Sequence, residues 1–380
     1  MRKVLMFFAG NERGGAAAHI TTLARTIVKY GKRDRFLFVS LGNGPLASSV
    51  AETGIPLRVI SSGTVGALRE LSNMIRGERV LLHSHGPRLN ILAAFVANQA
   101  HVPWTSTIHS HPSYDFLGSR VKSWVYPRLH LWSLRQAIGL FIVEPSLEQA
   151  LPTKTVLDVP NALDVRPRNE PREKFASLWR ERLGLASKTR LIGIAARFHP
   201  VKNIDILIRA ASRLQTQDTH LLIAGDGELR SSLEALTQEL GLVDKVHFLG
   251  FLTDMYEFYN AIDIHILPSK SEGTPFCVLE AGAYGAANIA SDIPSLRDLL
   301  QGGRAGELVP VGDVDSTARA IDQLLQGEND RRQFVQTFQS NVLPKFMPEK
   351  MLAAYERGYT VLEEDILRSR HYNDPRIRNG

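Results

Sequence analysis

The sequence predicts an α/β protein with two domains, each built around a parallel sheet. Apolar segments of strand length alternate with segments of helix length in both halves of the chain, and this alternation is typical of parallel sheets covered on both faces. The length of 380 residues exceeds what one hydrophobic core usually holds. A polar, proline-bearing stretch at 166–189 separates the two series, so we place the domain boundary at residue 165.

In the first half, short apolar runs are followed by turns or glycine-rich loops. The expected strands and strand ends are 4–9, 36–40, 57–60, 80–86, 104–112, 140–143 and 156–164. A helix is expected to run through residue 29, and a second at 45–52 ends at Gly54. The charged start and apolar run of residues 1–9 are better explained by a first strand than by a signal peptide, because a glycine-rich loop follows and a cleavage site does not.

The loop 10–19 carries the pair Gly14-Gly15 between the first strand and its helix. Glycines in such a loop let the backbone approach a ligand closely, as in phosphate-binding loops, although a tight turn without a ligand explains the pair equally well. The loop lacks the pattern Gly-x-Gly-x-x-Gly, so the dinucleotide fingerprint is absent.

Four histidines follow two neighbouring strands: His83 and His85 after one, His109 and His111 after the next. Ligands of open α/β sheets bind at the carboxyl ends of strands, so we expect these side chains to contact hydroxyl or phosphate groups. A zinc site is disfavoured because no carboxylate or cysteine accompanies either pair. For His83 and His111, a loop position without a functional role is the best explanation.

The first half is basic. Residues 1–165 carry 18 Lys and Arg against 10 Asp and Glu, a net charge of +8, whereas the whole chain carries +6. The segment 113–140 adds Trp and Tyr to these basic residues, which suits a membrane interface, although a helix with an apolar core-facing side explains it somewhat better. No nucleic-acid-binding motif accompanies the charge.

The second half begins a new β-α series at 191–196. Its first loop brings Arg197 and Lys202 to the end of a strand, where two cations suit a diphosphate. Further strands are expected at 221–224 and 246–250, and helices at 317–326 and 346–368, followed by a basic tail at 369–380. Cys277 is the sole cysteine, which excludes an intrachain disulfide.

The stretch 269–282 carries the strongest site signal. A strand at 261–268 precedes it, and a helix at 276–284 follows, with Thr274 as N-cap and Pro275 at the first helical position. This predicts a phosphate site at the free amides of residues 276–278. Glu272 and Glu280 would border the same cleft, although a capped helix with two surface glutamates remains the simpler interpretation.

Taken together, these motifs resemble the retaining, GT-B-type glycosyltransferases of the family-four or group one kind. The resemblance rests on Glu-x7-Glu at Glu272 and Glu280, the Gly14-Gly15 loop, Ala196-Arg197 with Lys202, Pro160-Asn161-Ala-Leu-Asp164 and Gly225-Asp226-Gly227. It implies two Rossmann-like domains whose parallel sheets face each other across a cleft. Residues 1–165 would bind the acceptor and 166–345 the nucleotide-sugar, with the helix 346–368 crossing back to the first domain.

The resemblance also implies individual roles. Glu272 and His109 would be catalytic, lying beside the donor sugar. The expected donor-binding residues are Arg197, Lys202, Glu280, Gly14, Gly15, Thr274, Phe276, Cys277 and Val278. The acceptor-side candidates are His85, Asn11 and Arg13. We expect no metal, because Arg197, Lys202 and the helix N-terminus would stabilise the leaving diphosphate.

The sequence departs from the family pattern after the second acid, where Ala-x-Gly-x-Pro-Val is replaced by Ala283-Tyr-Gly285-Ala286-Ala287-Asn288. The expected function is metal-independent retaining transfer from a nucleotide-sugar, UDP- or GDP-linked, to a saccharide or lipid-linked acceptor. The alternatives are a nucleotide-sugar epimerase of the same fold and an inactive sugar- or lipid-binding relative. No cofactor beyond the donor is expected. We expect a cytoplasmic protein, peripheral at an anionic membrane surface, that does not bind nucleic acid.

Overall fold

The computed structural model describes residues 1–109, 122–152, 155–167, 169–252 and 254–372. The chain divides into two compact units. Unit 1 comprises Met1–Ala162 and the C-terminal segment from Phe346, and unit 2 comprises Leu163–Lys345. His111 and Arg120, and the last eight residues of the expected tail, lie outside the described residues.

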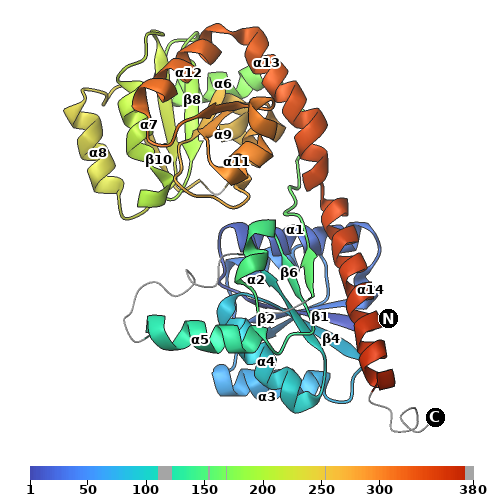
Figure 1. Cartoon of the computed structure of the whole chain (residues 1–380). Coiled ribbons are helices and arrows are strands. Elements are labelled where there is room, and N and C mark those ends of the chain that lie inside the picture. Colours follow the sequence, from blue (N-terminus) through green and yellow to red (C-terminus); the bar gives the residue numbers. More distant parts are fainter. Residues whose placement is uncertain (110–121, 153–154, 168, 253, 373–380) are drawn as a thin grey trace. The chain divides into compact units, whose positions relative to one another are not determined.

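Unit 1 is built around a seven-stranded sheet in the order β3-β2-β1-β4-β5-β6-β7, with every pairing parallel (Figure 1). Its strands are β1 (Lys3–Ala9), β2 (Phe36–Leu41), β3 (Leu57–Ile60), β4 (Val80–His85), β5 (Trp104–Ile108), β6 (Leu140–Ile142) and β7 (Val156–Asp158). The helices between them are α1 (Gly15–Lys29), α2 (Pro45–Ala51), α3 (Thr64–Ile75), α4 (Pro87–Ala100) and α5 (Lys122–Leu134).

Alternate residues of the central strand β1 enter two separate cores, one on each face of the sheet. Met6 and Phe8 pack into the core formed with α1 and the C-terminal helix, whereas Leu5 and Phe7 pack into the core formed with α3 and α4. Successive side chains of a strand point to opposite faces, and this sheet is covered on both of them. The apolar run of β1 therefore follows from its central position.

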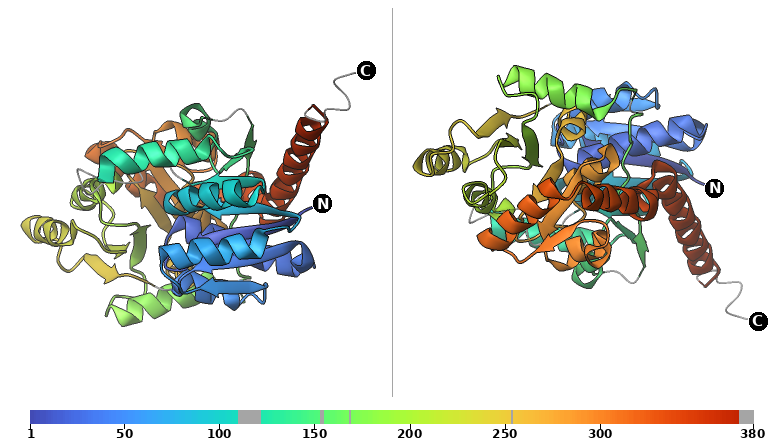
Figure 2. Two further views of the ribbon diagram at one scale, coloured as in Figure 1. Left: turned by 90° about the horizontal axis from the view of Figure 1, so that it is seen from below. Right: turned by 90° about the horizontal axis from the view of Figure 1, so that it is seen from above.

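The C-terminal helix α14 (Pro348–Tyr372) packs on unit 1. Its Tyr355 and Tyr359 are fully buried in the core that contains Met6 and Phe8. The N-terminus of the chain lies beside α14 in both figures, and the amide of residue 2 donates to Glu363 Oε1 at 2.7 Å (Figures 1 and 2). Residues more than 300 positions apart therefore share one core.

Two glycines allow α14 to approach the sheet closely. A Cβ on Gly358 would lie 2.3 Å from the Phe141 ring, and a Cβ on Gly139 would lie 2.6 Å from Leu362. Contacts this short do not occur for real Cβ atoms, so any side chain at either position would push the helix away from β6.

Unit 2 contains a six-stranded parallel sheet in the order β10-β9-β8-β11-β12-β13. Its strands are β8 (Arg190–Ala195), β9 (Thr219–Ala224), β10 (Val246–Gly250), β11 (Ile264–Leu267), β12 (Ala287–Ser291) and β13 (Glu307–Val309). The helices are α6 (Arg172–Arg182), α7 (Ile204–Ala211), α8 (Arg230–Glu239), α9 (Tyr256–Ala261), α10 (Phe276–Tyr284), α11 (Pro294–Leu299), α12 (Val314–Gln326) and α13 (Glu328–Thr337).

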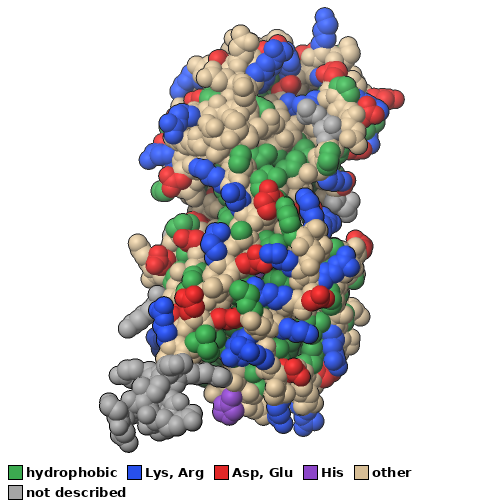
Figure 3. Space-filling view, turned by 90° about the vertical axis from the view of Figure 1, so that its right-hand side faces the viewer, with side chains coloured by type: hydrophobic (Ala, Val, Ile, Leu, Met, Phe, Trp, Pro, Cys, Tyr) green, Lys and Arg blue, Asp and Glu red, His purple; other side chains and the backbone are tan. Residues whose placement is uncertain are grey.

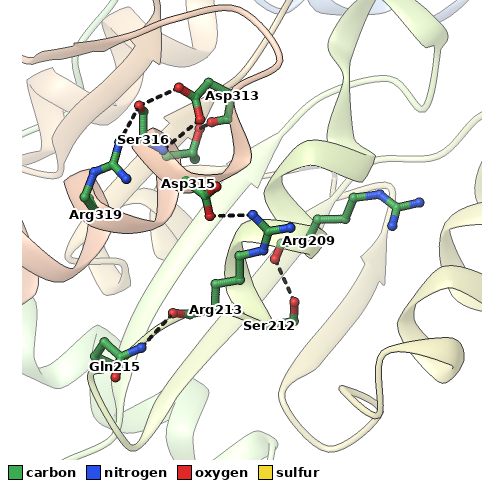
Figure 4. A network of polar contacts seen from close by, with 9 residues as sticks. Arg209, Ser212, Arg213, Gln215, Asp313, Asp315, Ser316 and Arg319 are labelled. Atoms are coloured by element: carbon green, nitrogen blue, oxygen red, sulfur yellow. Dashed lines mark hydrogen bonds and ion pairs between the residues drawn. The ribbon is translucent and has the colours of Figure 1, made fainter.

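Polar contacts at the surface of unit 2 cap the N-terminus of α12 and connect this helix to the segment after α7 (Figure 4). Asp313 is the N-cap of α12, and its carboxylate accepts hydrogen bonds from the Ser316 amide at 2.9 Å and hydroxyl at 2.6 Å. Such a cap satisfies amides that the first helical turn leaves open. Arg213 then forms an exposed ion pair with Asp315.

Both sheets are entirely parallel, which confirms the predicted fold class, but some local expectations are wrong. His83 and His85 lie inside β4 rather than in a loop. Thr107 bonds the ring of His83, and His109 bonds Nδ1 of His85. The strand expected at 261–268 is shorter, since α9 extends to Ala261. Strands β12 and β13 were not predicted from the sequence; the alanines and the asparagine of β12 have low strand propensity.

Candidate functional site

Lys202 and Glu272 form an ion pair in unit 2, with 2.6 Å between Nζ and Oε1. Lys202 ends the short helical turn after β8, and Glu272 lies in the loop between β11 and α10. The two side chains are only 21% and 8% exposed, so water screens the pair weakly. Glu272 is therefore not the surface glutamate of the simpler interpretation.

Backbone contacts hold the two loops of this ion pair together. The amide of Lys270 donates to the Val201 carbonyl at 2.8 Å, which joins the loop after β11 to the turn after β8. Ser295, at the start of α11, donates from its hydroxyl to the Glu272 carbonyl at 2.8 Å. These contacts fix the position of the Glu272 main chain.

The first turn of α10 differs by one residue from the prediction. Pro275, with φ −75° and ψ 117°, is the N-cap, and Thr274 makes no capping hydrogen bond. As N-cap, Pro275 accepts the first bonds of the helix at its carbonyl, from the Val278 amide at 3.2 Å and the Leu279 amide at 3.4 Å. Only the amides of Phe276 and Cys277 then lack a partner within the described chain, and both lie at the positive end of the helix dipole.

Glu280 lies on the same helix and is partly buried. It shares a hydrogen bond with Tyr259 of α9, a residue that the sequence analysis did not select. Burial raises the pKa of the Glu280 carboxyl to about 7, while the Tyr259 hydrogen bond and the charge of Arg166 oppose that rise. Glu280 therefore changes charge close to neutral pH. Burial likewise raises the pKa of the neighbouring Cys277 thiol to about 12.

Arg197 is exposed in the loop after β8 and pairs with no acidic side chain in the described part of the molecule. The loop after β9 contacts the loop that carries Arg197, because the Phe198 amide donates to the Asp226 carbonyl at 2.9 Å. Gly225 and Gly227 have φ of 132° and 157°, and a Cβ on Gly225 would lie 1.9 Å from a carbonyl oxygen of the Arg197 loop. The Gly-Asp-Gly sequence therefore lets two strand-end loops contact each other.

In unit 1, the glycine loop precedes α1 as predicted. Gly14 is the N-cap, with φ 75° and no side-chain capping bond, and Gly15 begins the helix. The positive φ explains why glycine occupies position 14. Asn11 and Arg13 are exposed in this loop.

His85 and His109 lie together at the ends of β4 and β5, with 3.2 Å between His85 Nδ1 and His109 Nε2. The rings of His19 and His83 complete a cluster, since His19 lies 5.0 Å from His109 and His83 lies 4.9 Å from His85, measured between ring centroids. Burial lowers the pKa of all four imidazoles, that of His19 to about 4. The cluster is therefore uncharged at neutral pH.

Tyr355 of α14 bonds two parts of this cluster. Its hydroxyl lies 2.8 Å from His19 Nε2 and 2.7 Å from Thr107 Oγ1. Thr107 in turn bonds His83 Nε2 at 2.8 Å, and Tyr359 bonds His83 Nδ1 at 2.9 Å. The C-terminal helix thus helps to position the histidines, and His83 has a structural role that the sequence analysis did not assign to it.

Two adjoining cavities open at the carboxyl edge of the unit 1 sheet, with volumes of about 360 and 320 Å³. They share a border that consists of Ala9, Glu12, His85, Gly86 and Pro87. Apart from Arg88, the remaining polar lining consists of uncharged hydrogen-bonding groups, namely Asn11, Asn43, Ser61, Ser62, Asn90, Thr107, His109 and His130. Groups of this kind suit the hydroxyls of a saccharide.

His19, Tyr259 and Tyr355 were missed because they gain partners only through tertiary contacts. His19 lies within the predicted helix after the glycine loop, so its position next to that loop was the one available signal. Among the described residues, no group of three or more His, Cys, Asp or Glu side chains has a metal-binding arrangement. None of the described helices is long and apolar enough to cross a membrane.

Residues 176–340, which make up most of unit 2, match the model of the family described as glycosyl transferases group 1. Unit 2 is therefore similar to the group 1 glycosyl transferases. This unit contains the ion pair of Lys202 with Glu272, the N-terminus of α10, and Glu280.

Curated glycosyltransferases are similar over most of the chain. The chain is 28% identical over 311 residues to the putative glycosyltransferase EpsF of Bacillus subtilis, which covers 77% of this chain and 79% of that protein. It is 27% identical over 269 residues to the UDP-Gal:alpha-D-GlcNAc-diphosphoundecaprenol alpha-1,3-galactosyltransferase of Escherichia coli, with 67% and 69% covered.

Among solved structures, HepE of Anabaena, crystallised in complex with UDP, aligns with a TM-score of 0.78 at 18% identity. The alignment covers 94% of this chain and 100% of HepE, and a crystal structure of HepE with UDP-glucose aligns equally well. This likeness shows that the chain has the GT-B fold.

Proposed function

We propose that the protein transfers a sugar from a nucleotide-diphosphate sugar to a saccharide or lipid-linked acceptor. The observation that carries this proposal is the ion pair of Lys202 with Glu272 beside the open N-terminus of α10. A cation and free amides can stabilise a diphosphate, and a carboxylate can accept hydrogen bonds from sugar hydroxyls, so this arrangement supports the proposal. The nucleotide is a uridine or guanosine diphosphate, and the UDP complexes of HepE favour uridine.

Each donor group has a partner in this site. Arg197 and Lys202 contact the diphosphate together with the amides of Phe276 and Cys277, and Glu280 accepts hydrogen bonds from the ribose hydroxyls. In the structure Lys202 is paired with Glu272, so the donor exchanges one oxyanion partner of the lysine for another. Glu272 is then left to contact the sugar.

We propose transfer with retention and without a metal. The anomeric C–O bond to the diphosphate breaks, the acceptor hydroxyl forms a new bond on the same face of that carbon, and its proton leaves with the diphosphate. The charge that develops on the diphosphate is stabilised by Arg197, Lys202 and the helix N-terminus, as preorganised cations and dipoles do in other transferases. His109, a residue of unit 1, is the second catalytic residue of this proposal.

The acceptor binds unit 1 in the two cavities lined by Asn11 and His85. The Escherichia coli relative is named for an acceptor on diphosphoundecaprenol, which supports a lipid-linked acceptor for this chain. An exposed apolar surface on α4 and α5 supports contact with a membrane: Phe95, Tyr126 and Leu129 are 52%, 37% and 38% exposed. We therefore place the enzyme at the cytoplasmic face of a membrane.

The basic excess of residues 1–165 would favour an anionic membrane. Arg128 and Arg135 lie on or next to α5, close in sequence to the exposed Leu129. The face drawn in Figure 3 mixes basic, acidic and apolar side chains, so the excess is not concentrated there. The α4–α5 surface is the better candidate because it combines aromatic and basic residues.

A screen of UDP-, GDP- and ADP-sugars by thermal shift tests the donor assignment, because a ligand that binds the folded state raises its melting temperature. We expect one nucleotide series to stabilise the protein. Hydrolysis of that donor then separates a transferase from an inactive relative, and the absence of an epimerised product excludes an epimerase. A protein that none of the three series stabilises would contradict the proposal.

A further inference from the structure

The contact between His85 and His109 restricts which ring nitrogens of the two histidines carry hydrogen. His85 is the last residue of β4 and is 4% exposed, and β4 pairs in parallel with β5 so that His85 lies opposite Thr107. His109 follows two residues later. The hydrogen bond joins His85 Nδ1 to His109 Nε2 at 3.2 Å, with 32° between the ring planes.

Both rings are neutral. Burial holds the pKa of each well below the usual value for histidine, and the neighbouring His19 lowers both further. A neutral imidazole carries one N–H, so one nitrogen donates and the other accepts. The hydrogen bond therefore couples the tautomers of the two rings and leaves two arrangements. Either His85 Nδ1 donates, or His109 Nε2 donates.

The second nitrogen of His85 distinguishes these arrangements. His85 Nε2 is fully buried and has no hydrogen-bond partner in the described chain. If His109 donated, His85 would carry its hydrogen on Nε2, as a buried N–H without an acceptor. If His85 donates, Nε2 is instead a lone pair without a donor. Unpaired buried N–H groups are the rarer and costlier of the two in proteins.

We infer that His85 holds His109 in the tautomer with hydrogen on Nδ1, so that His109 presents an N–H donor to its cavity. His109 Nδ1 has no partner in the described chain and is not among its fully buried atoms, and the ring lines the cavity of about 320 Å³. His109 therefore donates a hydrogen bond to a substrate oxygen and does not remove a proton. His85 is a positioning residue that acts through His109.

The surroundings of His109 agree with an uncharged ring. His19 of α1 packs edge-on against it, with 80° between ring planes, and His85 of β4 occupies its Nε2 side. The other titratable groups lining the cavity are His130 of α5 and Glu12 of the glycine loop. Burial lowers the pKa of His130 to about 4, and Glu12 is exposed to solvent. The identity of the substrate oxygen rests on the proposed function, but the tautomer does not.

The tautomer is measured directly by NMR of the full-length protein labelled with ¹⁵N-histidine, without any ligand. Long-range ¹H–¹⁵N spectra at pH 7.5 show which ring nitrogen carries hydrogen, and loss of one spin system in His109→Gln assigns His109 among the 12 histidines. We expect hydrogen on Nδ1 of His109 and on Nδ1 of His85. Hydrogen on Nε2 of His109, or on both of its nitrogens, would overturn the inference.

A pair of variants tests whether His85 sets this state. The amide nitrogen of Asn in His85→Asn lies near the position of Nδ1 and can donate to His109, whereas His85→Leu cannot. We expect His109 to change tautomer and titrate closer to its ordinary pKa in His85→Leu, with donor turnover reduced about tenfold and newly dependent on pH. His85→Asn should restore both.

The exposed His101→Leu, which leaves the cluster untouched, is the matched control. His109 signals that are the same in His85→Leu and wild type would show that His85 does not act through His109. So would a His85→Asn variant whose His109 tautomer and donor turnover match those of His85→Leu. Because the spectra need no substrate, a failure of the proposed function appears separately, as wild-type protein with the expected tautomer but without donor turnover.

Discussion

Lys202 Nζ lies 2.6 Å from Glu272 Oε1, and this ion pair joins the two strand-end loops that would hold the donor. The pair implies different roles for its two members. Lys202 can leave Glu272 for a diphosphate, whereas Glu272 has no second cation among the residues described around it. The two charges should therefore be separable by mutation.

Glu272→Gln should abolish most donor turnover without weakening UDP binding. The amide removes the carboxylate beside the sugar and frees Lys202 for the diphosphate, so affinity should stay equal or rise. Coupled detection of UDP release gives the turnover, and calorimetric titration gives the affinity. Near-normal turnover in the variant, with circular dichroism unchanged, would remove Glu272 from the reaction.

The second prediction concerns Glu280, whose pKa burial raises to about 7. Ribose hydroxyls donate to the ionised carboxylate, so affinity for uridine should rise with pH up to about 7 and then level off. The slope below that point is at most about tenfold per pH unit for one proton. Uridine is the probe because it has no phosphate that titrates in this range. Glu280→Gln should bind weakly and independently of pH, and a pH-dependent Gln variant would refute the assignment.

The buried histidines predict acid sensitivity of unit 1. The pKa of His19 is lowered from 6.5 to about 4, so the unfolded chain binds this proton first as the pH falls. The stability that neutral His19 contributes is complete above pH 6.5 and is lost between 6.5 and 4, on the order of 3 kcal/mol for a shift of this size. Urea unfolding followed at pH 7.5, 6 and 5 measures the loss.

His19→Gln is the informative variant for this pH dependence, because it cannot titrate but keeps a side chain able to bond Tyr355. It should be less stable than wild type at pH 7.5 and should lose less stability on acidification. An identical pH dependence in the two proteins would show that His19 does not contribute to the acid sensitivity.

The membrane surface is tested by co-sedimentation with vesicles. The protein should pellet with anionic lipid, less at high salt and not with neutral lipid, because basic residues and interfacial aromatics both contribute. Phe95→Ser with Leu129→Ser should reduce the pelleted fraction, and Arg128→Glu should do so most at low salt. Phe251→Ser, at a residue of unit 2 that is 76% exposed, is the control for general surface apolarity. A wild-type protein that stays in the supernatant with every lipid would refute the membrane assignment.

The sequence predicted most strands and the helix at 276–284 because their signals are local: apolar runs, a proline at a helix start, and glycines at turns. It also brought Arg197, Lys202 and Glu272 to strand ends, where the topology of a parallel sheet places ligands. The ion pair between Lys202 and Glu272 was not predictable, since it joins residues 70 positions apart. Tyr259 was missed for the same reason, because its bond to Glu280 is a tertiary contact.

The buried histidines show what could not be predicted from the sequence. Histidine is usually found at a surface or a site, so the sequence analysis placed His83 in a loop without a role. Its burial is possible only because Thr107 and Tyr359 bond both ring nitrogens, and Tyr359 comes from the far end of the chain. A single sequence gives no sign of such a partner.

Arg197, Lys202 and the amides of unit 2 should bind the donor diphosphate without a metal. Calorimetric titration of UDP, and of GDP in parallel, into wild type and into Arg197→Ala/Lys202→Ala tests it most directly, with EDTA present throughout. Each lost charged hydrogen bond costs about 1.5–3 kcal/mol, so the double variant should bind at least about 100-fold more weakly. Arg209→Ala, at an exposed arginine of the same unit, should bind like wild type. Equal affinity in the double variant, or wild-type binding that requires Mg²⁺ or Mn²⁺, would contradict the account.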